Sequence, residues 1–304
     1  MPRVGVANRP FPPLQDDPQA VTAAGLLELL AADPREHGHP QTRWTLAALR
    51  ATVPRFAGAS LSGIWRVLAA CKLRWRRGRD HLHSPDPDYQ RKRDRLRTIE
   101  AHVAEHPTSA ELFYLDEVTY YRQPSLAAAY APTGSATPLA ERSTRGNTTT
   151  RVLAALNAHS GQVVSLQATR IGVPALLRFF KALVAAYPGR RLYIVLDNWP
   201  VHFHPDLLAA LEPQQAPFPF FRPRSWSPEP SPKAKRLNLP IQLVQLPTYS
   251  PWLNPIEKLW RWLKQDVLHL HRLAHDLSAL RALVLAFLAR FQSPSPDLLR
   301  YVGL

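Results

Sequence analysis

Cysteine is almost absent from this sequence, and long apolar runs are absent altogether. The single Cys71 among 304 residues excludes a disulfide framework and a zinc site built from cysteine pairs. No apolar run approaches the roughly 18 residues that a transmembrane helix needs. The first residues, MPRVGVANRPFPPLQDDP, also lack the apolar segment of a secretory signal. These absences predict a protein of a reducing compartment with no membrane partner.

Acidic residues are also scarce. The chain has 38 Lys and Arg residues against 23 Asp and Glu residues, a net charge of +15, and its pI is about 10.5. Residues 1–110 have 17 basic and 11 acidic side chains (+6), and residues 111–304 have 21 and 12 (+9). Because both parts are positive, a single basic tail does not explain the charge. The excess indicates a polyanionic partner, above all nucleic acid.

The amino-terminal region predicts a helical DNA-binding unit. Residues 1–19 are rich in proline and have no periodicity, which predicts a flexible tail. Within residues 20–80, two short helices flank a turn at Gly58, and Ser60 can cap the second helix. The apolar positions of that helix are Leu61, Ile64, Trp65 and Leu68. This pattern is typical of a helix-turn-helix.

A basic stretch follows the second helix and favours DNA binding over an ordinary helical hairpin, which is the alternative interpretation. Between Arg66 and Arg97 there are 11 basic and four acidic residues, a local charge of 11 − 4 = +7. Residues 81–110 are expected to form a basic linker, around Ser84–Asp88, and then a charged helix. The expected DNA contacts are Ser62, Gly63, Arg66, Lys72, Arg74, Arg76, Arg77 and Arg79.

Residues 111–304 predict an α/β domain. Strand-like segments occur at 112–116, 151–156, 163–168, 192–196 and 241–246, and helical patterns near 174–187, 205–211, 252–270 and 276–291. The order is three strands, helix, strand, helix, strand, helix. We therefore expect a ribonuclease H-like catalytic domain, a mixed sheet with flanking helices, preceded by the small all-α helix-turn-helix domain.

Three carboxylates stand out in this domain. Asp116 and Asp197 are each expected to end an apolar strand, and Glu257 falls in an apolar-striped helix. If the two strands are parallel neighbours, the two aspartates lie side by side, and a packed helix can bring Glu257 opposite. Oxygen ligands without His or Cys suit Mg²⁺ or Mn²⁺. The alternatives are a capping role for each aspartate and a solvated charge for Glu257. Side chains alternate along a strand, so we expect Asp116 rather than Glu117 to face the site.

These residues carry a resemblance to a known family. Leu115-Asp116-Glu117, Leu196-Asp197-Asn198 followed by His202, and above all the block from Leu246 to Trp260 (LPTYSPWLNPIEKLW) resemble the DDE catalytic domain of mariner-like transposases. The resemblance is strongest to the bacterial insertion-sequence branch of six-thirty type. Trp44-Thr45-Leu46 and the segment SPDPDY at residues 84–89 also resemble that branch, and the resemblance extends from about residue 20 to residue 290.

The resemblance implies a function and its site. Asp116, Asp197 and Glu257 would be the catalytic triad, holding two Mg²⁺ ions for which Mn²⁺ can substitute, and Asn198, His202 and Asn254 would support it. A histidine without a catalytic role at the start of a helix is the alternative for His202. The implied partners are double-stranded DNA, namely terminal inverted repeats and target DNA at TA, and a second copy of the chain on that DNA. The implied location is the bacterial cytoplasm, at the nucleoid.

The sequence departs from the family pattern in two places. Asp197 and Glu257 are 257 − 197 = 60 residues apart, more than is usual, and the surplus is a Pro-rich insertion at residues 212–240. Members of that branch usually have two helical DNA-binding units before the catalytic domain, and in this sequence only the second is clear. A catalytically idle or domesticated DNA-binding derivative is therefore an alternative to an active transposase. A nuclease that cuts without strand transfer is a third reading, which the helix-turn-helix disfavours.

Overall fold

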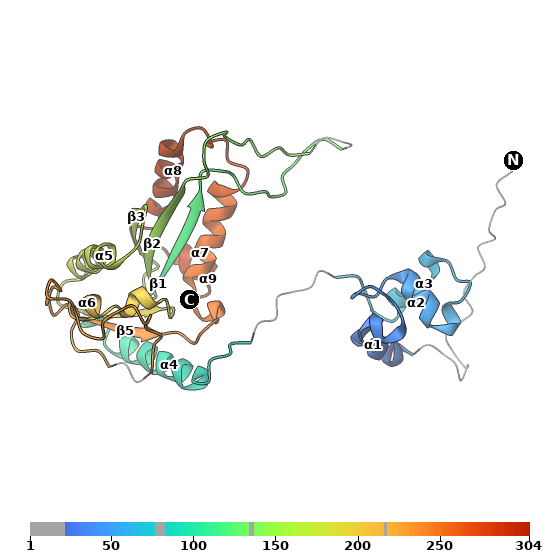
Figure 1. Ribbon diagram of the computed structural model, residues 1–304, viewed down its shortest axis with the longest axis horizontal. Coiled ribbons are helices and arrows are strands. Elements are labelled where there is room, and N and C mark those ends of the chain that lie inside the picture. Colours follow the sequence, from blue (N-terminus) through green and yellow to red (C-terminus); the bar gives the residue numbers. More distant parts are fainter. Residues whose placement is uncertain (1–21, 77–82, 134–136, 216–217) are drawn as a thin grey trace. The chain divides into compact units, whose positions relative to one another are not determined.

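The computed structural model describes residues 22–76, 83–133, 137–215 and 218–304. The expected flexible tail at residues 1–19 lies outside these ranges, as do the predicted DNA contacts Arg77 and Arg79. The chain divides into two compact units, Met1–His81 and Leu82–Leu304, which are described separately below (Figure 1). Within the described ranges, no helix is both long enough and apolar enough to cross a membrane.

The amino-terminal unit is entirely helical. Each of its α-helices begins at a hydroxyl side chain, Thr22, Thr45 or Ser60, which accepts a hydrogen bond from the backbone N–H three residues on. The helices are α1 (Ala23–Ala31), α2 (Leu46–Thr52) and α3 (Leu61–Ala70), with 3₁₀ turns η1 (Pro34–His37) and η2 (Pro54–Phe56). They enclose a small core of Leu26, Trp44, Ala48, Leu49, Phe56, Ile64 and Val67.

The predicted apolar face of α3 is partly wrong. Ile64 is fully buried, but the side chains of Leu61 and Trp65 are 41% and 57% exposed, and Val67 is buried instead. The core of this unit is small, so α3 buries Ile64 and Val67, and Leu68 only in part. Trp65 consequently shares the exposed face of α3 with Ser62 and Arg66.

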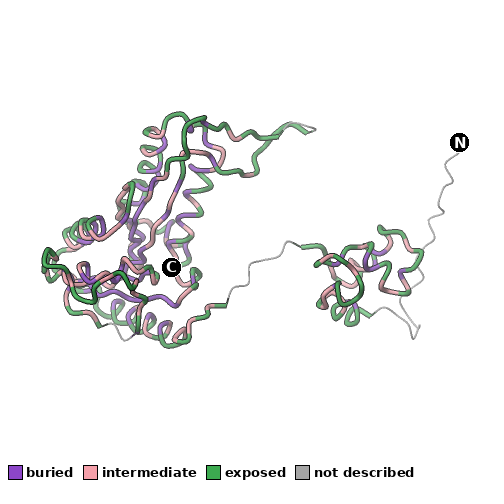
Figure 2. Tube along the Cα trace, viewed as in Figure 1, coloured by how far each residue is buried: buried purple, intermediate pink, exposed green. Residues whose placement is uncertain are grey.

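A five-stranded mixed sheet forms the centre of the second unit. Its strand order is β3-β2-β1-β4-β5, with β1 antiparallel to β2, β2 antiparallel to β3, and β4 parallel to both β1 and β5. The strands are β1 (Ala110–Tyr121), β2 (Thr149–Asn157), β3 (Val163–Ala168), β4 (Arg191–Leu196) and β5 (Ile241–Gln245). Figure 2 shows that β1, β2, β4 and β5 are largely buried, whereas β3 is mostly half-buried.

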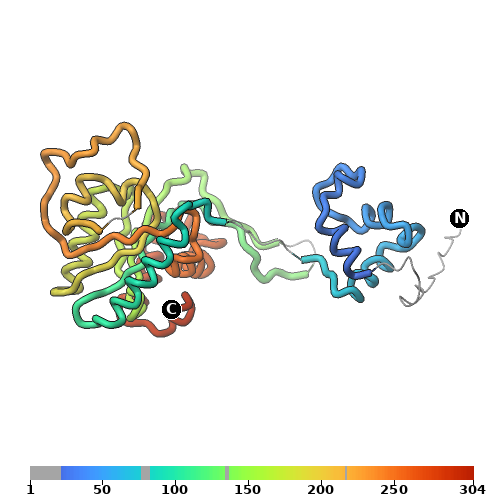
Figure 3. The backbone as a smooth tube through the Cα atoms, turned by 90° about the horizontal axis from the view of Figure 1, so that it is seen from below, coloured from blue at the N-terminus to red at the C-terminus, as the bar shows by residue number. Residues whose placement is uncertain are grey.

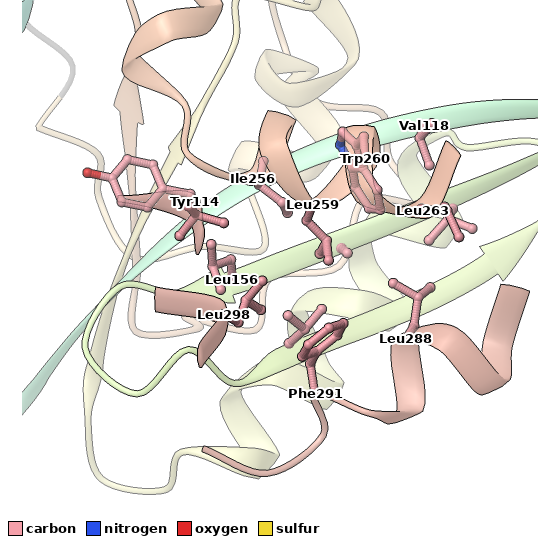
Figure 4. Packing of buried hydrophobic residues seen from close by; sticks show 14 of the residues in the cluster. Tyr114, Val118, Leu156, Ile256, Leu259, Trp260, Leu263, Leu288, Phe291 and Leu298 are labelled. Carbon is pink, nitrogen blue, oxygen red and sulfur yellow. The ribbon is translucent and has the colours of Figure 1, made fainter. Parts of the chain in front are cut away.

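Helices cover both faces of the sheet, and each face has its own apolar core. One face packs against α4 (Tyr89–Glu105), α7 (Ile256–Leu263), α8 (Leu277–Ala289) and α9 (Pro296–Val302), and Figure 4 shows the part of this packing that involves α7, α8 and α9. The other face packs against α5 (Val173–Ala186), the 3₁₀ turn η3 (Pro200–Phe203) and α6 (Pro205–Leu208). The alternation of β1 is visible in these cores, because Leu112 and Tyr114 belong to the first and Phe113 and Leu115 to the second.

Two expected element boundaries and one expected linker differ from the structure. Asp116 does not end a strand, because β1 continues to Tyr121. The helix expected from residue 252 begins at Ile256, after the 3₁₀ turn η4 (Pro251–Leu253), and its last turn is the π-helix η5 (Lys264–Leu268). The segment Ser84–Asp88 is not a free linker, since it is hydrogen-bonded to the loop after β5.

The insertion at residues 212–240 forms a loop that closes on itself. No helix or strand occurs in its described residues, and a bridge between Leu211 and Leu239 joins its two ends. Because the ends meet, β5 can still pair with β4 despite the added residues. Figure 3 shows the insertion, in the orange range of the colour bar, as a wide loop at the edge of this unit.

Candidate active site

Asp116 and Asp197 occupy neighbouring positions on parallel strands. The pairing of β1 with β4 matches Tyr114 to Val195, so the same register places Asp116 opposite Asp197 two residues further on. Asp197 follows directly after β4, at the carboxyl end where functional groups of α/β sheets gather. The expectation that the two aspartates lie side by side therefore agrees with the register.

Alternation along β1 separates Asp116 from Glu117. The Asp116 side chain lies on the α7 face, where its Oδ2 accepts a hydrogen bond of 2.8 Å from the indole N–H of Trp260. Glu117 points to the opposite face, where its Oε1 lies 2.9 Å from Nε2 of His202. Asp116 is thus the member of the pair that faces α7 and Glu257, as the sequence predicts.

Helix α7 brings Glu257 and Trp260 to the same site. Glu257 lies in the first turn of α7, on its exposed side, and Trp260 is one turn later and almost fully buried. The sequence predicted Trp260 only as part of an apolar stripe. A buried indole must still find an acceptor for its N–H, and here that acceptor is the Asp116 carboxylate.

One oxygen of Asp197 is held by hydrogen bonds. Its Oδ1 accepts from the backbone N–H of Trp199 at 2.9 Å and lies 3.2 Å from Nδ1 of His202. The Asp197 side chain is 56% exposed, and Oδ2 has no hydrogen-bond partner among the described residues. The carboxylate is therefore fixed through one oxygen and open through the other.

His202 joins Asp197 to Glu117. Its imidazole is fully buried, with Nδ1 toward Asp197 and Nε2 toward Glu117. Burial alone would lower the pKa of His202, but the two carboxylates raise it to about 10. Burial would raise the pKa of Asp197, but the hydrogen bonds from His202 and from the Trp199 backbone lower it. An imidazolium donates from both nitrogens, which fits an acceptor on each side.

The other two carboxylates lie in an electrostatically unfavourable setting. Burial, then the charges of Glu257 and Glu117, raise the pKa of Asp116 to about 8. Loss of surrounding water and the charge of Asp197 likewise raise the pKa of Glu257, although Lys264 and Arg261 oppose this shift. Neither Asp116 nor Glu257 forms an ion pair with any residue in the described ranges.

The donor set fits a hard divalent cation, although the side chains are not arranged as a closed metal site. Among the described residues, no group of three or more His, Cys, Asp or Glu side chains already forms such a site. The charge of Glu257 nevertheless acts on Asp116, and that of Asp197 acts on Glu257, so a cation between the carboxylates would offset the repulsion that adds to burial in raising the pKa of Asp116. Carboxylate oxygens are the ligands that Mg²⁺ and Mn²⁺ prefer.

Two asparagines connect the strands to the loop that precedes Glu257. The amide of Asn198 donates to the carbonyl of Leu246 at 2.7 Å, which ties the end of β4 to the end of β5. The amide of buried Asn254 lies 3.4 Å from the carbonyl of Leu115, directly before Asp116. Both residues thus contact backbone that leads to the carboxylates, and the supporting role expected of them stays a prediction.

The segment at residues 84–89 holds the same loop from outside. The Ser84 hydroxyl donates to the carbonyl of Thr248 at 2.5 Å, and the Thr248 N–H donates to Oδ2 of Asp86 at 2.8 Å. The same Asp86 oxygen pairs with Nζ of Lys92 at 2.8 Å, and both side chains are about 5% exposed or less. Trp252 adds a contact by donating to the hydroxyl of Tyr89 at 3.1 Å. Sequence reasoning missed this clamp because its partners are about 160 residues apart.

Replacing Asp86 by Asn should destabilise the second unit in a pH-dependent way. Burial would raise the pKa of Asp86, but Lys92 and the Thr248 N–H lower it below its ordinary 3.8, so its stabilising effect is fully present above pH 3.8 and is lost as the pH falls through the lowered pKa of the folded protein. We expect Asp86→Asn to lower the free energy of unfolding by about 3–5 kcal/mol at pH 7. Denaturant unfolding at pH 7 and at pH 3.5 should show the difference shrinking at the lower pH.

Asp88→Asn provides the matched control. Asp88 pairs with Arg91, which is 69% exposed, so its loss should cost less than about 1 kcal/mol at either pH. Equal losses for the two variants, or a loss for Asp86→Asn that is the same at both pH values, would contradict the clamp.

Most of the predicted DNA contacts are accessible on the amino-terminal unit. Ser62, Arg66, Lys72, Arg74 and Arg76 are exposed, and Gly63 is partly exposed. None of these basic side chains forms an ion pair with a residue in the described part of the chain. Their assignment as DNA contacts stays a prediction.

A family model described as "DDE superfamily endonuclease" matches residues 111–281, which is more than half of the chain. The matched segment begins in β1 and includes Asp116, Asp197 and Glu257. The chain belongs to the DDE superfamily endonuclease family.

One relative resembles the chain in sequence, and solved structures resemble it in fold. The chain is 25% identical over 252 residues to the insertion element IS630 uncharacterized 39 kDa protein of Shigella sonnei. This match covers 81% of the chain and 64% of that relative's length. The fold of this DDE family member is also that of the Mos1 mariner paired end complex with Mn, with a TM-score of 0.59 and 16% identity over 98% of this chain and 78% of the other. The Mos1 strand transfer complex gives a TM-score of 0.55 and 15% identity over 98% and 77%.

These likenesses confirm the predicted fold class. The second unit of this DDE family member is a ribonuclease H-like mixed sheet with flanking helices, and an all-helical region precedes it.

Proposed function

We propose that this chain is a DNA transposase that binds the ends of a mobile element, cleaves them, and joins the freed 3′-hydroxyl to target DNA at TA. The observation that supports this best is the convergence of three carboxylates, from β1, from the end of β4 and from α7, in a DDE endonuclease domain, two of which, Asp116 and Glu257, have no ion-pair partner among the described residues. Relatives of known structure are described as paired-end and strand-transfer complexes, one with Mn and one with Mg.

Asp116, Asp197 and Glu257 would hold two divalent cations, Mg²⁺ or Mn²⁺. Such a pair activates the attacking oxygen and stabilises the leaving oxygen of an in-line displacement at phosphorus. In the first step water adds to the phosphorus, the P–O3′ bond breaks, and the 3′-oxygen leaves as a hydroxyl. In the second step that hydroxyl attacks a target phosphodiester and a target 3′-hydroxyl leaves.

The protein's own groups fix the geometry for both steps. Trp260 holds one oxygen of Asp116, and Trp199 and His202 hold one oxygen of Asp197, so each aspartate keeps an oxygen for a ligand. Asn198 and the clamp from Asp86 hold the loop that leads to Glu257. Two element ends need two active sites, and we therefore propose that the chain acts as a homodimer on DNA.

The test uses the chromosomal DNA at the borders of the element that contains the gene. Full-length protein is incubated with end-labelled duplex from each border and a target plasmid, with Mg²⁺, with Mn²⁺ or with EDTA. We expect metal-dependent cuts at the border that leave a 3′-hydroxyl, and joined products at TA. Binding without cleavage in either metal would favour the idle DNA-binding derivative, and neither binding nor cleavage would reject the function.

A further inference from the structure

A basic groove lies between helix α5 and the carboxyl-terminal end of the insertion. It is a cavity of about 350 Å³ on the face of the sheet that is opposite α7. Arg178 and Lys181 line it from α5, and Lys233 and Lys235 line it from the insertion. Among the described residues that line this cavity, Asp206 of α6 is the one acidic side chain.

The four cations have no ion-pair partner among the residues that the structure describes. All four are exposed. Asp206 is already engaged, because its two oxygens accept from the backbone N–H of Ser231 at 2.6 Å and from the Ser231 hydroxyl at 2.9 Å. Like charges gathered around one cavity repel one another, and a polyanion would remove that cost.

The insertion presents its lysines from a fixed frame. Phe220 stacks on Phe203 with ring centroids 4.9 Å apart, and Trp226 meets His204 edge-on at 4.5 Å. The hydrogen bonds from Ser231 to Asp206 then anchor the loop two residues before Lys233. Since α5 is packed against the sheet, both walls of the groove are ordered before a ligand binds, which lowers the entropy cost of binding.

The groove also lies within reach of the DNA that the active site would hold. Asp206 is nine residues after Asp197, and nine extended residues span at most about 31 Å. One turn of duplex DNA is about 34 Å long. Asp206 therefore lies no further from Asp197 than about the length of one duplex turn.

From these observations we propose that the groove between α5 and the insertion binds the phosphate backbone of duplex DNA. This inference rests on the proposed function, since it assigns a second contact to the same substrate. Lysine and arginine contacts to phosphate position DNA without reading its sequence. The insertion thus enlarges the DNA-binding surface of the catalytic unit.

The test measures DNA binding by full-length protein as a function of salt. Fluorescence anisotropy with a labelled duplex compares wild type with Lys233→Ala/Lys235→Ala and with Arg178→Ala/Lys181→Ala. Each lost phosphate contact reduces the magnitude of the slope of log K against log[salt] by about 0.9. Each double variant should therefore reduce that magnitude by about 1.8. The decrease in slope should be the same for element-end duplex and for duplex of unrelated sequence.

Arg142→Ala/Arg272→Ala is the matched control, because both arginines are exposed, neither lines the groove and neither lies in the basic stretch from Arg66 to Arg97. We expect a smaller change in slope for this variant than for either groove variant. If the wild-type protein binds DNA and both groove variants show the wild-type slope, the proposal that the groove binds DNA is overturned and the proposed function stands. A loss confined to one DNA sequence would also overturn the groove proposal, and wild type that fails to bind DNA at all would reject both.

Discussion

Replacing Asp197 by Asn should reduce metal-dependent cleavage of element-end DNA by about a thousandfold or more, on the scale seen when one group that stabilises transition-state charge is removed. Asn keeps the shape of the side chain and can still accept from the Trp199 N–H at Oδ1, but it removes the negative charge at the open oxygen. We expect a similar loss for Glu257→Gln. Initial rates with end-labelled duplex in Mg²⁺ and in Mn²⁺ measure the effect.

Glu229→Gln is a suitable control for these variants. Glu229 is an exposed carboxylate of the insertion, so its neutralisation should leave both folding and cleavage unchanged. Thermal unfolding of Asp197→Asn should stay close to that of wild type, because the side chain is half exposed. Cleavage by Asp197→Asn within tenfold of the wild-type rate would rule out its assignment as a cation ligand.

Two substitutions of His202 should separate its contact with Asp197 from its contact with Glu117. An Asn amide can reach the position of Nδ1, toward Asp197, and a Gln amide the position of Nε2, toward Glu117. We expect His202→Gln to lose activity by about 10–100-fold, the scale for groups that orient a metal ligand. His202→Asn should keep more activity but lose more stability, by about 3–5 kcal/mol, because it leaves the Glu117 carboxylate buried without a partner.

The measurements are the cleavage rate over a range of Mn²⁺ concentrations and denaturant unfolding without metal. If His202 only stabilises the fold, activity should follow stability, and His202→Asn should be the less active of the two. If His202→Asn is the less active variant, His202 does not position Asp197. It is then a buried structural histidine, which is the alternative that the sequence left open.

The sequence identifies the carboxylates because they interrupt apolar patterns. Asp116 and Asp197 each follow an apolar run, and alternation along the strand excludes Glu117 from the same face, as the contact of Asp116 with Trp260 confirms. The order of strands and helices likewise predicts the sheet. The predicted end of β1 was wrong because β1 continues to pair with β2 as far as Tyr121. Pairing with a distant strand leaves no local signal in the sequence.

The supporting contacts were beyond sequence reasoning for a related reason. The sequence indicated that Trp260 belongs to the core and that Glu117 is only the neighbour of Asp116 in the chain. The fold places Trp260 beside Asp116 and Glu117 beside His202. Leu61 and Trp65 were expected to be buried, but the small core of the first unit leaves them exposed. In each case the environment of the side chain depends on tertiary packing, which the local pattern does not contain.

The central claim is that Asp116, Asp197 and Glu257 together form one divalent-cation site. It is tested most directly by anomalous X-ray scattering from crystals of the full chain grown with Mn²⁺. We expect Mn²⁺ peaks within about 2.0–2.3 Å of oxygens from all three carboxylates, in the range for hard cations bound to oxygen. Manganese that binds elsewhere, or no peak at the three carboxylates in saturating Mn²⁺, would contradict the claim.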